Sequence, residues 1–563
     1  MAIADPEEAP LNADLLTLAE EYWKAELAAS PLSALILGIH DHDEDMDDAS
    51  REAEDDRIAE LRRFATGAAA FDPDTLSADD QITRDVMIYE AGTRADLLEM
   101  RQAELEVNHA IGFQAMLPVL FPQFPIDEPE HAEAMLVKYP KFGTFIRQMT
   151  TRLKAGVAGD RTPVAGTVEK VVEQLDGFLA TAPGESVFLA IRSPQSFSDD
   201  DNVAWRDRLA TIVASDIYPA LEEYRNYIAD HVLAASRNED KPGICHLDGG
   251  DEWYRRAIKR HTSVDLSADE IHDVGVAQIH KLDEEYRELG AEALGTSDLK
   301  EIYARLRDDP DLHFDTGEDV RAASEVALAK AKAAMGDWFG RLPRADCLVQ
   351  ETPSGPTAFY FPPATDGSRP GAFFVNTSDP KSWGRYEIEA IAYHEGIPGH
   401  HLQLAISGEL TDVPEFRKHA GVTAYAEGWG LYTERLADEM GLYSGPLERI
   451  GMLSADSMRA GRLVVDTGIH AKGWTRQQAI DFIADNSPLH LGTIEPEIDR
   501  YIGMPGQALA YMIGRLEIVR MRKEAEEKMG DRFDIKGFHD TVLCSGLVPL
   551  PTLDRMVKDW AAA

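Results

Sequence analysis

Apolar residues along most of the chain recur every three or four positions, the period that buries one face of an α-helix. In the first such segment, Leu15, Leu18, Tyr22 and Leu27 follow this period between residues 12 and 29. The same spacing predicts further helices at 51–66, 77–105, 129–155, 164–181, 200–236, 250–262, 267–290 and 454–472. The sequence therefore predicts a mainly α-helical fold.

Two stretches break the helical pattern in the first half of the chain. Val107–Pro125 contains three prolines and is predicted to form an ordered apolar loop. Asn238–Gly250 is rich in Pro, Gly and Asp, which is typical of a connection between lobes. We therefore expect an N-terminal helical lobe over 1–240 and a second, catalytic lobe over 241–563, which together form one continuous structural unit.

Three short runs of β-favouring residues follow one another in the second lobe, at Cys347–Glu351, Thr357–Phe361 and Gly371–Asn376. Pro, Gly, Ser and Asp separate them, so they predict a small antiparallel sheet at about 346–377. Two interpretations of this sheet are equally open. Its edge could run along a cleft and pair with a peptide substrate, or the strands could form a purely structural hairpin.

Composition narrows the function classes. The 563 residues include 100 Asp and Glu but only 56 Lys and Arg, a net charge of −44, which argues against nucleic-acid binding. The three cysteines lack a C-x-x-C spacing and fit a reducing compartment. The acidic segment Met1–Pro10 has no apolar core typical of a signal peptide, and apolar runs such as Ala115–Phe121 are too short to span a membrane. We expect a cytoplasmic protein without a membrane or nucleic-acid partner.

The strongest chemical signal is a His-Glu pair, His394-Glu395, at the end of an apolar run. In the H-E-x-x-H motif of zinc hydrolases a second histidine follows four residues after the first, on the same helix face. Here that position is Pro398, and the next histidines are His400 and His401. On an unbroken helix His400 would be rotated by about 120° from His394, and His401 would lie about 10 Å farther along the axis.

A break in the helix removes this conflict. Pro398 cannot donate a backbone hydrogen bond to the carbonyl of His394, and Gly399 tolerates unusual backbone angles. A helix interrupted at 397–399 would bring His400 beside His394. The alternative is a polar helix that merely happens to contain several histidines.

A third metal ligand is available in the next helical segment. Glu427 lies 27 residues after His400, enough for one helix to end near Gly408 and the next to return antiparallel. Two histidines, one glutamate and an open fourth position form the ligand set of a catalytic zinc site. The predicted ligands of zinc, or of another divalent metal, are therefore His394, His400 and Glu427. His401 is the alternative to His400, or it contacts substrate beside it.

Several sequence blocks resemble the bacterial family known as domain of unknown function 885. They are H-E-G-I-P-G-H-H-L-Q at 394–403, E-G-W at 427–429, V-V-D-T-G-I-H at 464–470, P-G-Q-A-L at 505–509, and the segments at 30–32 and 38–41. The resemblance covers nearly the whole chain. It implies a two-lobed helical fold similar to the carboxypeptidase Taq group of zinc peptidases, in which Gly399-His400 corresponds to the G-H of H-E-x-G-H.

Further candidates lie on the helical segment at 454–472. Arg462, Asp466 and His470 are four residues apart and share one face. Asp466 could fix the tautomer of His470, as carboxylates do for catalytic or metal-bound imidazoles. The alternative is an exposed, salt-bridged stripe, and the family resemblance favours a functional His470.

The segment after Pro505-Gly506 places Tyr511 and Arg515 one helical turn apart. Tyr511 could donate to the oxyanion of the reaction, and Arg515 could bind a substrate carboxylate. A buried tyrosine and a surface arginine are the alternatives. Glu434, two turns after Glu427, and His539 are weaker candidates for contacts behind the site.

These observations predict a zinc-dependent peptidase of the carboxypeptidase or dipeptidase kind, with short peptides bound in a cleft between the two lobes. Glu395 is the predicted general base. The rival hypothesis is an inactive, metal-free relative that binds a peptide or small molecule. A hydrolase of another small amide fits the same residues.

Overall fold

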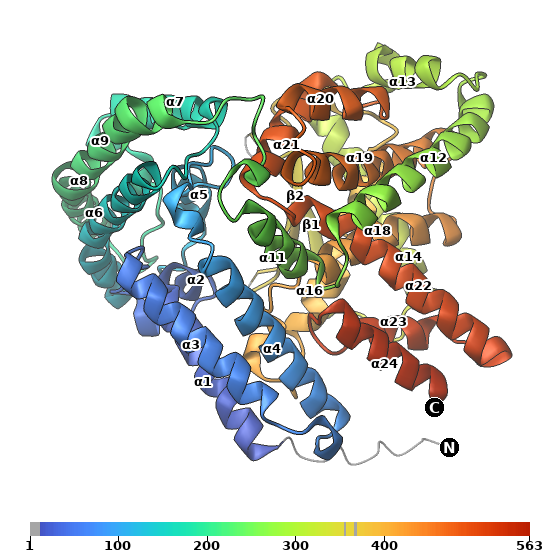
Figure 1. The fold of residues 1–563 in the computed structure, drawn as a ribbon, viewed down its shortest axis with the longest axis horizontal. Helices are drawn as coiled ribbons and strands as arrows, with labels where there is room; N and C mark the ends of the chain where they lie inside the picture. The colour runs from blue at the N-terminus through green and yellow to red at the C-terminus, as the bar shows by residue number, and fades with distance from the viewer. Residues whose placement is uncertain (1–11, 354–355, 365–366, 368) are drawn as a thin grey trace.

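The computed structural model describes residues 12–353, 356–364, 367 and 369–563, so the acidic segment Met1–Pro10 lies outside the described residues. The chain is mainly α-helical, as predicted (Figure 1). Helices of the first part are α1 Ala13–Ala29, α2 Pro31–Ile36, α3 Arg51–Ala69, α4 Ala78–Leu98, α5 Phe113–Leu120, α6 Pro129–Ala158, α7 Ala165–Ala180, α8 Asp199–Ile212, α9 Tyr218–Tyr227 and α10 Leu233–Ala235. Short π-helical turns join α8, α9 and α10 into one continuous run, as the pattern at 200–236 predicted.

The second part contains the sheet and the remaining helices. Its helices are α11 Gly250–Thr262, α12 Ala268–Ala293, α13 Leu299–Asp308, α14 Gly317–Trp338, α15 Ile388–Glu395, α16 His400–Gly408, α17 Glu415–Lys418, α18 Thr423–Glu439, α19 Pro446–His470, α20 Arg476–Asp485, α21 Leu491–Gly503, α22 Ala510–Met529, α23 Ile535–Leu543 and α24 Leu550–Ala562. No helix among the described residues is both long enough and apolar enough to cross a membrane.

The predicted loop at Val107–Pro125 is wrong, because α5 occupies its middle despite Pro118 within the helix. A proline in a short helix removes one backbone hydrogen bond. Here Leu117 and Phe121 are buried in the neighbouring core, and this apolar burial outweighs the loss.

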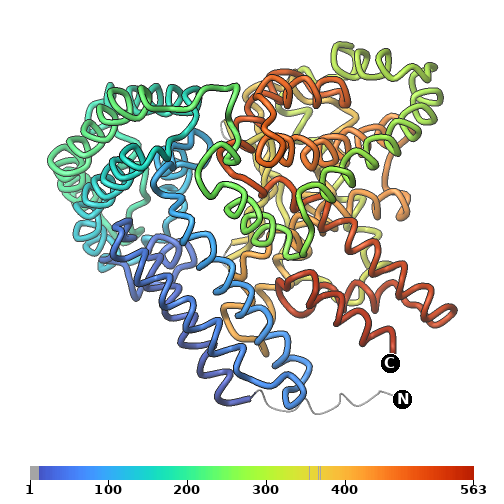
Figure 2. Tube along the Cα trace, in the orientation of Figure 1, coloured from blue at the N-terminus to red at the C-terminus, as the bar shows by residue number. Residues whose placement is uncertain are grey.

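The apolar cores do not divide at residue 240. The largest core contains residues of α3 and α4, such as Phe64 and Val86, together with Tyr393 and Trp429 from the second part. A second core lies mostly within residues 107–232, in α5 to α10, which form the left side of the molecule in Figure 2. The predicted N-terminal lobe over 1–240 is thus shared between two cores.

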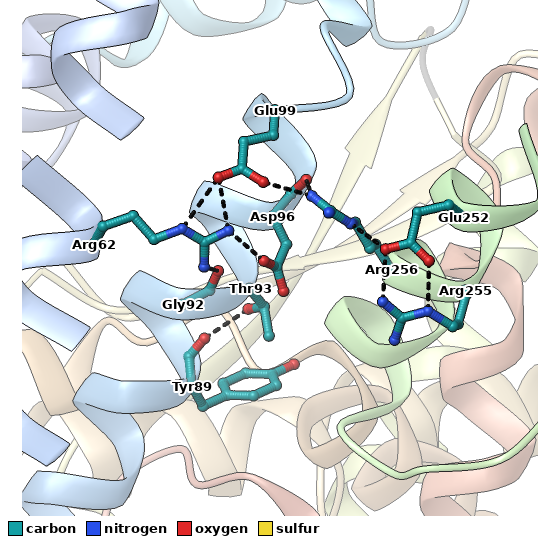
Figure 3. Close-up of polar contacts among 9 residues, drawn as sticks. All are labelled: Arg62, Tyr89, Gly92, Thr93, Asp96, Glu99, Glu252, Arg255 and Arg256. Atoms are coloured by element: carbon teal, nitrogen blue, oxygen red, sulfur yellow. Dashed lines mark hydrogen bonds and ion pairs between the residues drawn. The ribbon is translucent and has the colours of Figure 1, made fainter. Parts of the chain in front are cut away.

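Charged side chains join the N-terminal helices to α11 (Figure 3). Arg62 of α3 donates to Asp96 and Glu99 at the end of α4, with nitrogen–oxygen distances of 2.6 and 2.8 Å. The other oxygen of Glu99 accepts from Arg256 of α11 at 2.7 Å, and Arg256 also contacts Glu252. These contacts connect residues on both sides of the predicted lobe boundary.

The sheet consists of β1 Cys347–Thr352, β2 Ala358–Phe361 and β3 Gly371–Asn376, close to the predicted bounds. The predicted purely antiparallel arrangement is wrong. The strand order is β1-β3-β2, and β3 pairs parallel with β1 and antiparallel with β2. A parallel pair needs a crossover connection, and β2 forms part of the connection between β1 and β3. β2 is left at an edge of the sheet.

Candidate metal centre

The helix that carries His394 is broken where the sequence predicts it. α15 ends at Glu395 and α16 begins at His400, and the Ile397–Pro398 peptide bond between them is cis. A Cβ atom on Gly399 would lie 1.9 Å from the carbonyl oxygen of His394, so this tight connection requires glycine. The break brings the two histidine rings to a centroid distance of 4.8 Å, nearly perpendicular to each other.

Three ligand atoms converge at this break. Glu427 Oε2 lies 3.6 Å from His394 Nε2 and 3.4 Å from His400 Nε2, and all three ligand atoms lie within 4.8 Å of one another. Tetrahedral zinc with bonds of about 2.0–2.1 Å separates its ligand atoms by about 3.3–3.4 Å. The residues therefore fit a zinc ion held by two imidazoles and one carboxylate.

Helix α18 positions the candidate metal ligands, because it carries Glu427 and packs against His394. Glu427, Gly430 and Glu434 follow one another at helical spacing and face α15. A Cβ atom on Gly430 would come within 2.7 Å of the His394 ring, so glycine leaves the room that the imidazole occupies. Trp429 of the same helix donates from Nε1 to the carbonyl of Pro398 at 3.0 Å and holds the broken segment.

A buried carboxylate orients His394. Its Nδ1–H donates to Glu434 Oε1 at 2.8 Å, and the Glu434 side chain is only 1% exposed. This bond leaves Nε2 as the nitrogen that faces Glu427. A histidine that ligates a metal through one nitrogen usually donates its other N–H to such an acceptor. Glu434 thus lies behind the site, as the sequence suggested.

The electrostatics of the group favour an added positive charge. Burial alone would lower the pKa of His394, but the carboxylates of Glu427 and Glu434 outweigh burial and raise it to about 9. Burial alone would raise the pKa of Glu427, yet His394 and His400 hold it well below its usual range. Without a metal, the carboxylates of Glu427 and Glu434 draw a proton onto the imidazole of His394, and a divalent cation would satisfy the same acceptors.

His401 points away from the group, which resolves the alternative left open by the sequence. Its Nε2 lies 3.1 Å from the carbonyl of Ala345, and its Nδ1 lies 2.9 Å from the Tyr360 hydroxyl of β2. The N–H must therefore be on Nε2, and Nδ1 accepts from Tyr360. Burial lowers the pKa of His401 to about 4. This neutral imidazole fastens the sheet to α16.

A cavity of about 610 Å³ opens beside His394, His400 and Glu427, the three candidate ligands that we call the metal group. Its walls include β2 and one face of α19, and every lining residue falls between His313 and Tyr511. The cavity therefore lies within the second part of the chain, and the predicted placement between lobes 1–240 and 241–563 is wrong. Glu395 lines the cavity, and its carboxylate has no hydrogen bond or ion pair to any described residue. It is free to accept one from a water molecule.

Tyr511 lines the same cavity close to the ligands. Its ring lies 6.5 Å from that of His394, and burial, with Glu427 nearby, raises the pKa of its hydroxyl. Arg462 covers the ring at 4.4 Å and is itself fixed by Tyr501 and Glu497. Tyr511 thus keeps its proton and can donate it in a hydrogen bond.

The predicted pairing of Asp466 with His470 is wrong. Asp466 accepts instead from the hydroxyl of Tyr254 at 2.5 Å and from the backbone N–H of Gly506 at 3.1 Å. His470 is buried between the backbones of Ile244 and Tyr501. One helix turn separates the two side chains, but each bonds to a different neighbouring segment. Neither lines the cavity, so the expected catalytic role of His470 is not supported by its position.

Arg515 also lies outside the cavity lining. Its Nη1 donates to both oxygens of Asp456 at 2.7 and 2.8 Å, and Arg435 contacts the same buried carboxylate. The predicted substrate contact is wrong, because a guanidinium held by a buried acid is not available to a ligand. His539 is likewise a core residue, bonded to Tyr432 and to the backbone of Trp338.

Two cavity arginines escaped the sequence analysis, Arg459 and Arg500. Arg459 lines the cavity from α19, three residues before Arg462 and on the same helix face. The signal that could have found it is this spacing, which continues the polar face of Arg462 by one turn toward the N-terminus.

Comparison with known proteins gives a family and a fold. The family model described as "Bacterial protein of unknown function (DUF885)" matches residues 31–557. A crystal structure of the "putative lipoprotein" from Colwellia psychrerythraea is similar with a TM-score of 0.88 and 27% identity, covering 97% of this chain and 98% of that one. A "putative lipoprotein of unknown function" from Shewanella oneidensis has a TM-score of 0.75 and 18% identity, covering 97% and 99%. No curated protein matches the chain.

Proposed function

The chain belongs to the bacterial family of unknown function DUF885, and from the geometry of its site we propose that it is a zinc-dependent peptidase of short peptides. One observation carries the proposal. The Nε2 atoms of His394 and His400 lie 3.6 and 3.4 Å from one oxygen of Glu427, close to the separations between ligand atoms around tetrahedral zinc. A likeness in fold to the carboxypeptidase Taq group is part of the same proposal.

Each residue has a role that follows from its position. His394, His400 and Glu427 would hold the metal beside the cavity. When bound, zinc would supply a Lewis acid that activates water and polarises a carbonyl. Glu395 takes a proton from the attacking water and delivers it to the leaving amine. Tyr511 donates a hydrogen bond to the charge that develops on the carbonyl oxygen of the substrate.

The walls of the cavity support a peptide as the substrate. Ala358, Phe359 and Tyr360 of β2 line it, and β2 pairs only with β3 in the described sheet. Its outer edge offers backbone donors and acceptors that an extended peptide can use. A volume of about 610 Å³ suits a few residues rather than a folded protein.

The rival hypothesis of a metal-free binding protein rests on the insertion of Pro398 and Gly399. The insertion would favour it only by keeping His400 away from His394, whereas the two rings are neighbours. Glu395 lines the cavity and Glu427 lies beside both histidines, which also supports a metallopeptidase over a metal-free binding protein.

Metal analysis and two substitutions test the proposal together. The purified protein should contain about one zinc per chain, which chelation removes along with peptide hydrolysis. Glu427→Ala should lose zinc, whereas Glu395→Gln should keep zinc and lose turnover by several orders of magnitude. Glu415→Ala, on the exposed side of α17, is the control and should behave like the parent. If both site variants bound metal and hydrolysed peptides normally, the assignment would be wrong.

A further inference from the structure

The cavity beside the metal group contains both signs of charge. It is lined by three arginines and four glutamates, namely Arg459, Arg462, Arg500, Glu387, Glu395, Glu427 and Glu497. Two of the three arginines are already engaged with protein groups. Arg462 bonds Tyr501 and Glu497, and Arg500 bonds Glu497 and Gln507.

Arg459 is different. Among the described residues it forms no ion pair, and its one hydrogen bond is a long contact of 3.4 Å from Nη1 to the carbonyl of Ala455. Its Nε is buried without any hydrogen-bond partner. The chain carries 100 acidic residues against 56 basic ones, yet none of the described acids is paired with this guanidinium. A half-buried cation without a partner is costly unless a ligand supplies the anion.

One acid close to Arg459, Glu387, does not neutralise its charge. Glu387 lies close enough for Arg459 to act on its charge, but its two oxygens accept from Ser454 and from the backbone of Gly384. Burial raises the pKa of Glu387 above its usual range despite Arg459. Glu387 therefore lies near Arg459 without forming an ion pair with its guanidinium.

The distance between Arg459 and the candidate metal ligands is one that a short leaving group can span. The Arg459 guanidinium carbon lies 5.9 Å from the centre of the Tyr511 ring, and that ring lies 6.5 Å from His394. The guanidinium carbon of Arg459 therefore lies no more than about 12 Å from the centre of the His394 ring. With about 3.8 Å between consecutive Cα atoms, a gap of this size or shorter takes a leaving group of a few residues at most.

We propose that Arg459 binds the free α-carboxylate of the substrate and so makes the enzyme release a few residues at most from the C-terminus of short peptides. A guanidinium matches a carboxylate with two parallel N–H···O bonds, which fixes where the scissile bond lies. The inference rests on the proposed peptidase function for its cleavage step, but not for the binding step.

Three matched peptides distinguish a contact with the terminal carboxylate from a contact with a side-chain carboxylate. The first is an N-acetylated tripeptide of alanine with a free C-terminus, the second is its C-terminal amide, and the third is an amide with glutamate as the last residue. The zinc-loaded parent should cleave the free acid with a kcat/KM at least about thirty-fold above that of the plain amide, equivalent to about 2 kcal/mol. Preference for the glutamyl amide over the free acid would overturn the assignment to the terminal carboxylate.

Variants of Arg459 link the preference to this residue. Arg459→Met should reduce the thirty-fold preference to about threefold or less, and Arg459→Lys should keep part of it because the charge remains. Arg255→Met, which removes an equal charge from the exposed side of α11, should leave the preference unchanged. Zinc content and melting temperature of each variant establish that the metal group and the fold are intact. An unchanged preference in folded Arg459→Met would overturn the proposal.

Binding to the metal-free protein separates this proposal from the peptidase function. Calorimetry on the chelated protein should show tighter binding of the free acid than of the amide, and the difference should disappear in Arg459→Met. If that holds but the zinc-loaded protein cleaves nothing, the peptidase proposal fails and the carboxylate contact of Arg459 stands. If peptides are cleaved but free acid and amide bind and react equally, the peptidase proposal stands and the carboxylate contact of Arg459 fails.

Discussion

His394 and Glu434 are joined by a 2.8 Å hydrogen bond between the imidazole Nδ1 and the carboxylate Oε1, and both side chains are buried. The bond connects the broken helix α15 to α18, which also carries Glu427. Because it fixes the ring and its tautomer, it determines that Nε2 is the nitrogen offered to a metal. A residue that never touches the metal is thus predicted to control its affinity.

Replacing Glu434 tests this relationship. Glu434→Ala should weaken zinc binding by about 10–100-fold, because the ring loses both its orientation and the negative charge behind it. Glu434→Gln keeps an acceptor for the Nδ1–H and should lose less. Affinity is measured by competition with a chelator of known zinc affinity.

Glu439→Gln, at the exposed end of the same helix, is the matched control and should bind zinc like the parent. Equal zinc affinity of Glu434→Ala and the parent would mean that the hydrogen bond plays no part in metal binding.

The sequence was sufficient to predict that His394, His400 and Glu427 lie together, because its signals are local. The His-Glu pair, the helix break at Pro398-Gly399 and a glutamate one helical hairpin later depend on neighbouring residues alone. The choice between His400 and His401 could not be made, because it depends on how the break rotates α16 against β2. Hydrogen bonds from His401 to distant segments decide it.

A second test concerns the space that α18 leaves for His394. Gly430→Ala puts a methyl group where a Cβ would lie 2.7 Å from the imidazole, closer than atoms in contact can approach. The ring must move, and zinc affinity should fall by about tenfold or more by analogy with other losses of ligand orientation. Helical content should persist, since alanine favours helix over glycine by about 1 kcal/mol.

Gly408→Ala is the comparison for this substitution. No atom lies within 4 Å of the Cβ that it would add at the exposed end of α16, so zinc affinity should be unchanged. A Gly430→Ala variant with parental zinc affinity would show that the imidazole has room to shift without losing the metal.

The roles of residues on long helices were harder to predict than the metal group. Asp466 and His470 share a face of α19 by spacing, but their hydrogen bonds go to Tyr254 and to the backbone of Tyr501. Helical spacing states which side chains point the same way and not which segments surround them. The mixed sheet could not be predicted for the same reason, because strand propensity does not determine which strands pair with β3.

The ion pair of Arg515 with Asp456 leads to a stability prediction. Asp456 is completely buried, and Arg515→Leu would leave Arg435 as its remaining ionic partner. Removing the sole partner of a buried charge costs about 3–5 kcal/mol of the free energy of unfolding, and the loss should be smaller here because Arg435 still compensates Asp456. Urea denaturation should show this loss, while the preference for free-acid peptides stays at the parental level.

Arg255→Leu is the control for the loss of an exposed arginine, and we expect it to change the free energy of unfolding by no more than about 0.5 kcal/mol. A normal stability of Arg515→Leu, combined with a lost preference for free acids, would return Arg515 to the substrate site and contradict its assignment to the core.

Asp466 gives a prediction for pH. Burial raises its pKa from 3.8 to about 7, despite the hydrogen bonds from Tyr254 and Gly506 that lower it. Between these two pH values the folded state binds a proton that the unfolded state has released, so the free energy of unfolding falls as pH rises from about 4 to about 7. At about 1.4 kcal/mol per unit, the contribution of this group is about 4 kcal/mol.

Asp466→Asn removes the titrating group and isolates this contribution from those of the many other acids. Urea denaturation of parent and variant at pH 4.5, 6 and 8 should show the variant gaining stability relative to the parent as pH rises, by about 3 kcal/mol over this range. The same comparison with Asp240→Asn, an exposed aspartate, should show no trend. A stability difference between Asp466→Asn and the parent that stays constant with pH would mean that the carboxylate is already ionised in the folded protein. The hydrogen bonds from Tyr254 and Gly506 would then stabilise its charge more strongly than burial opposes it.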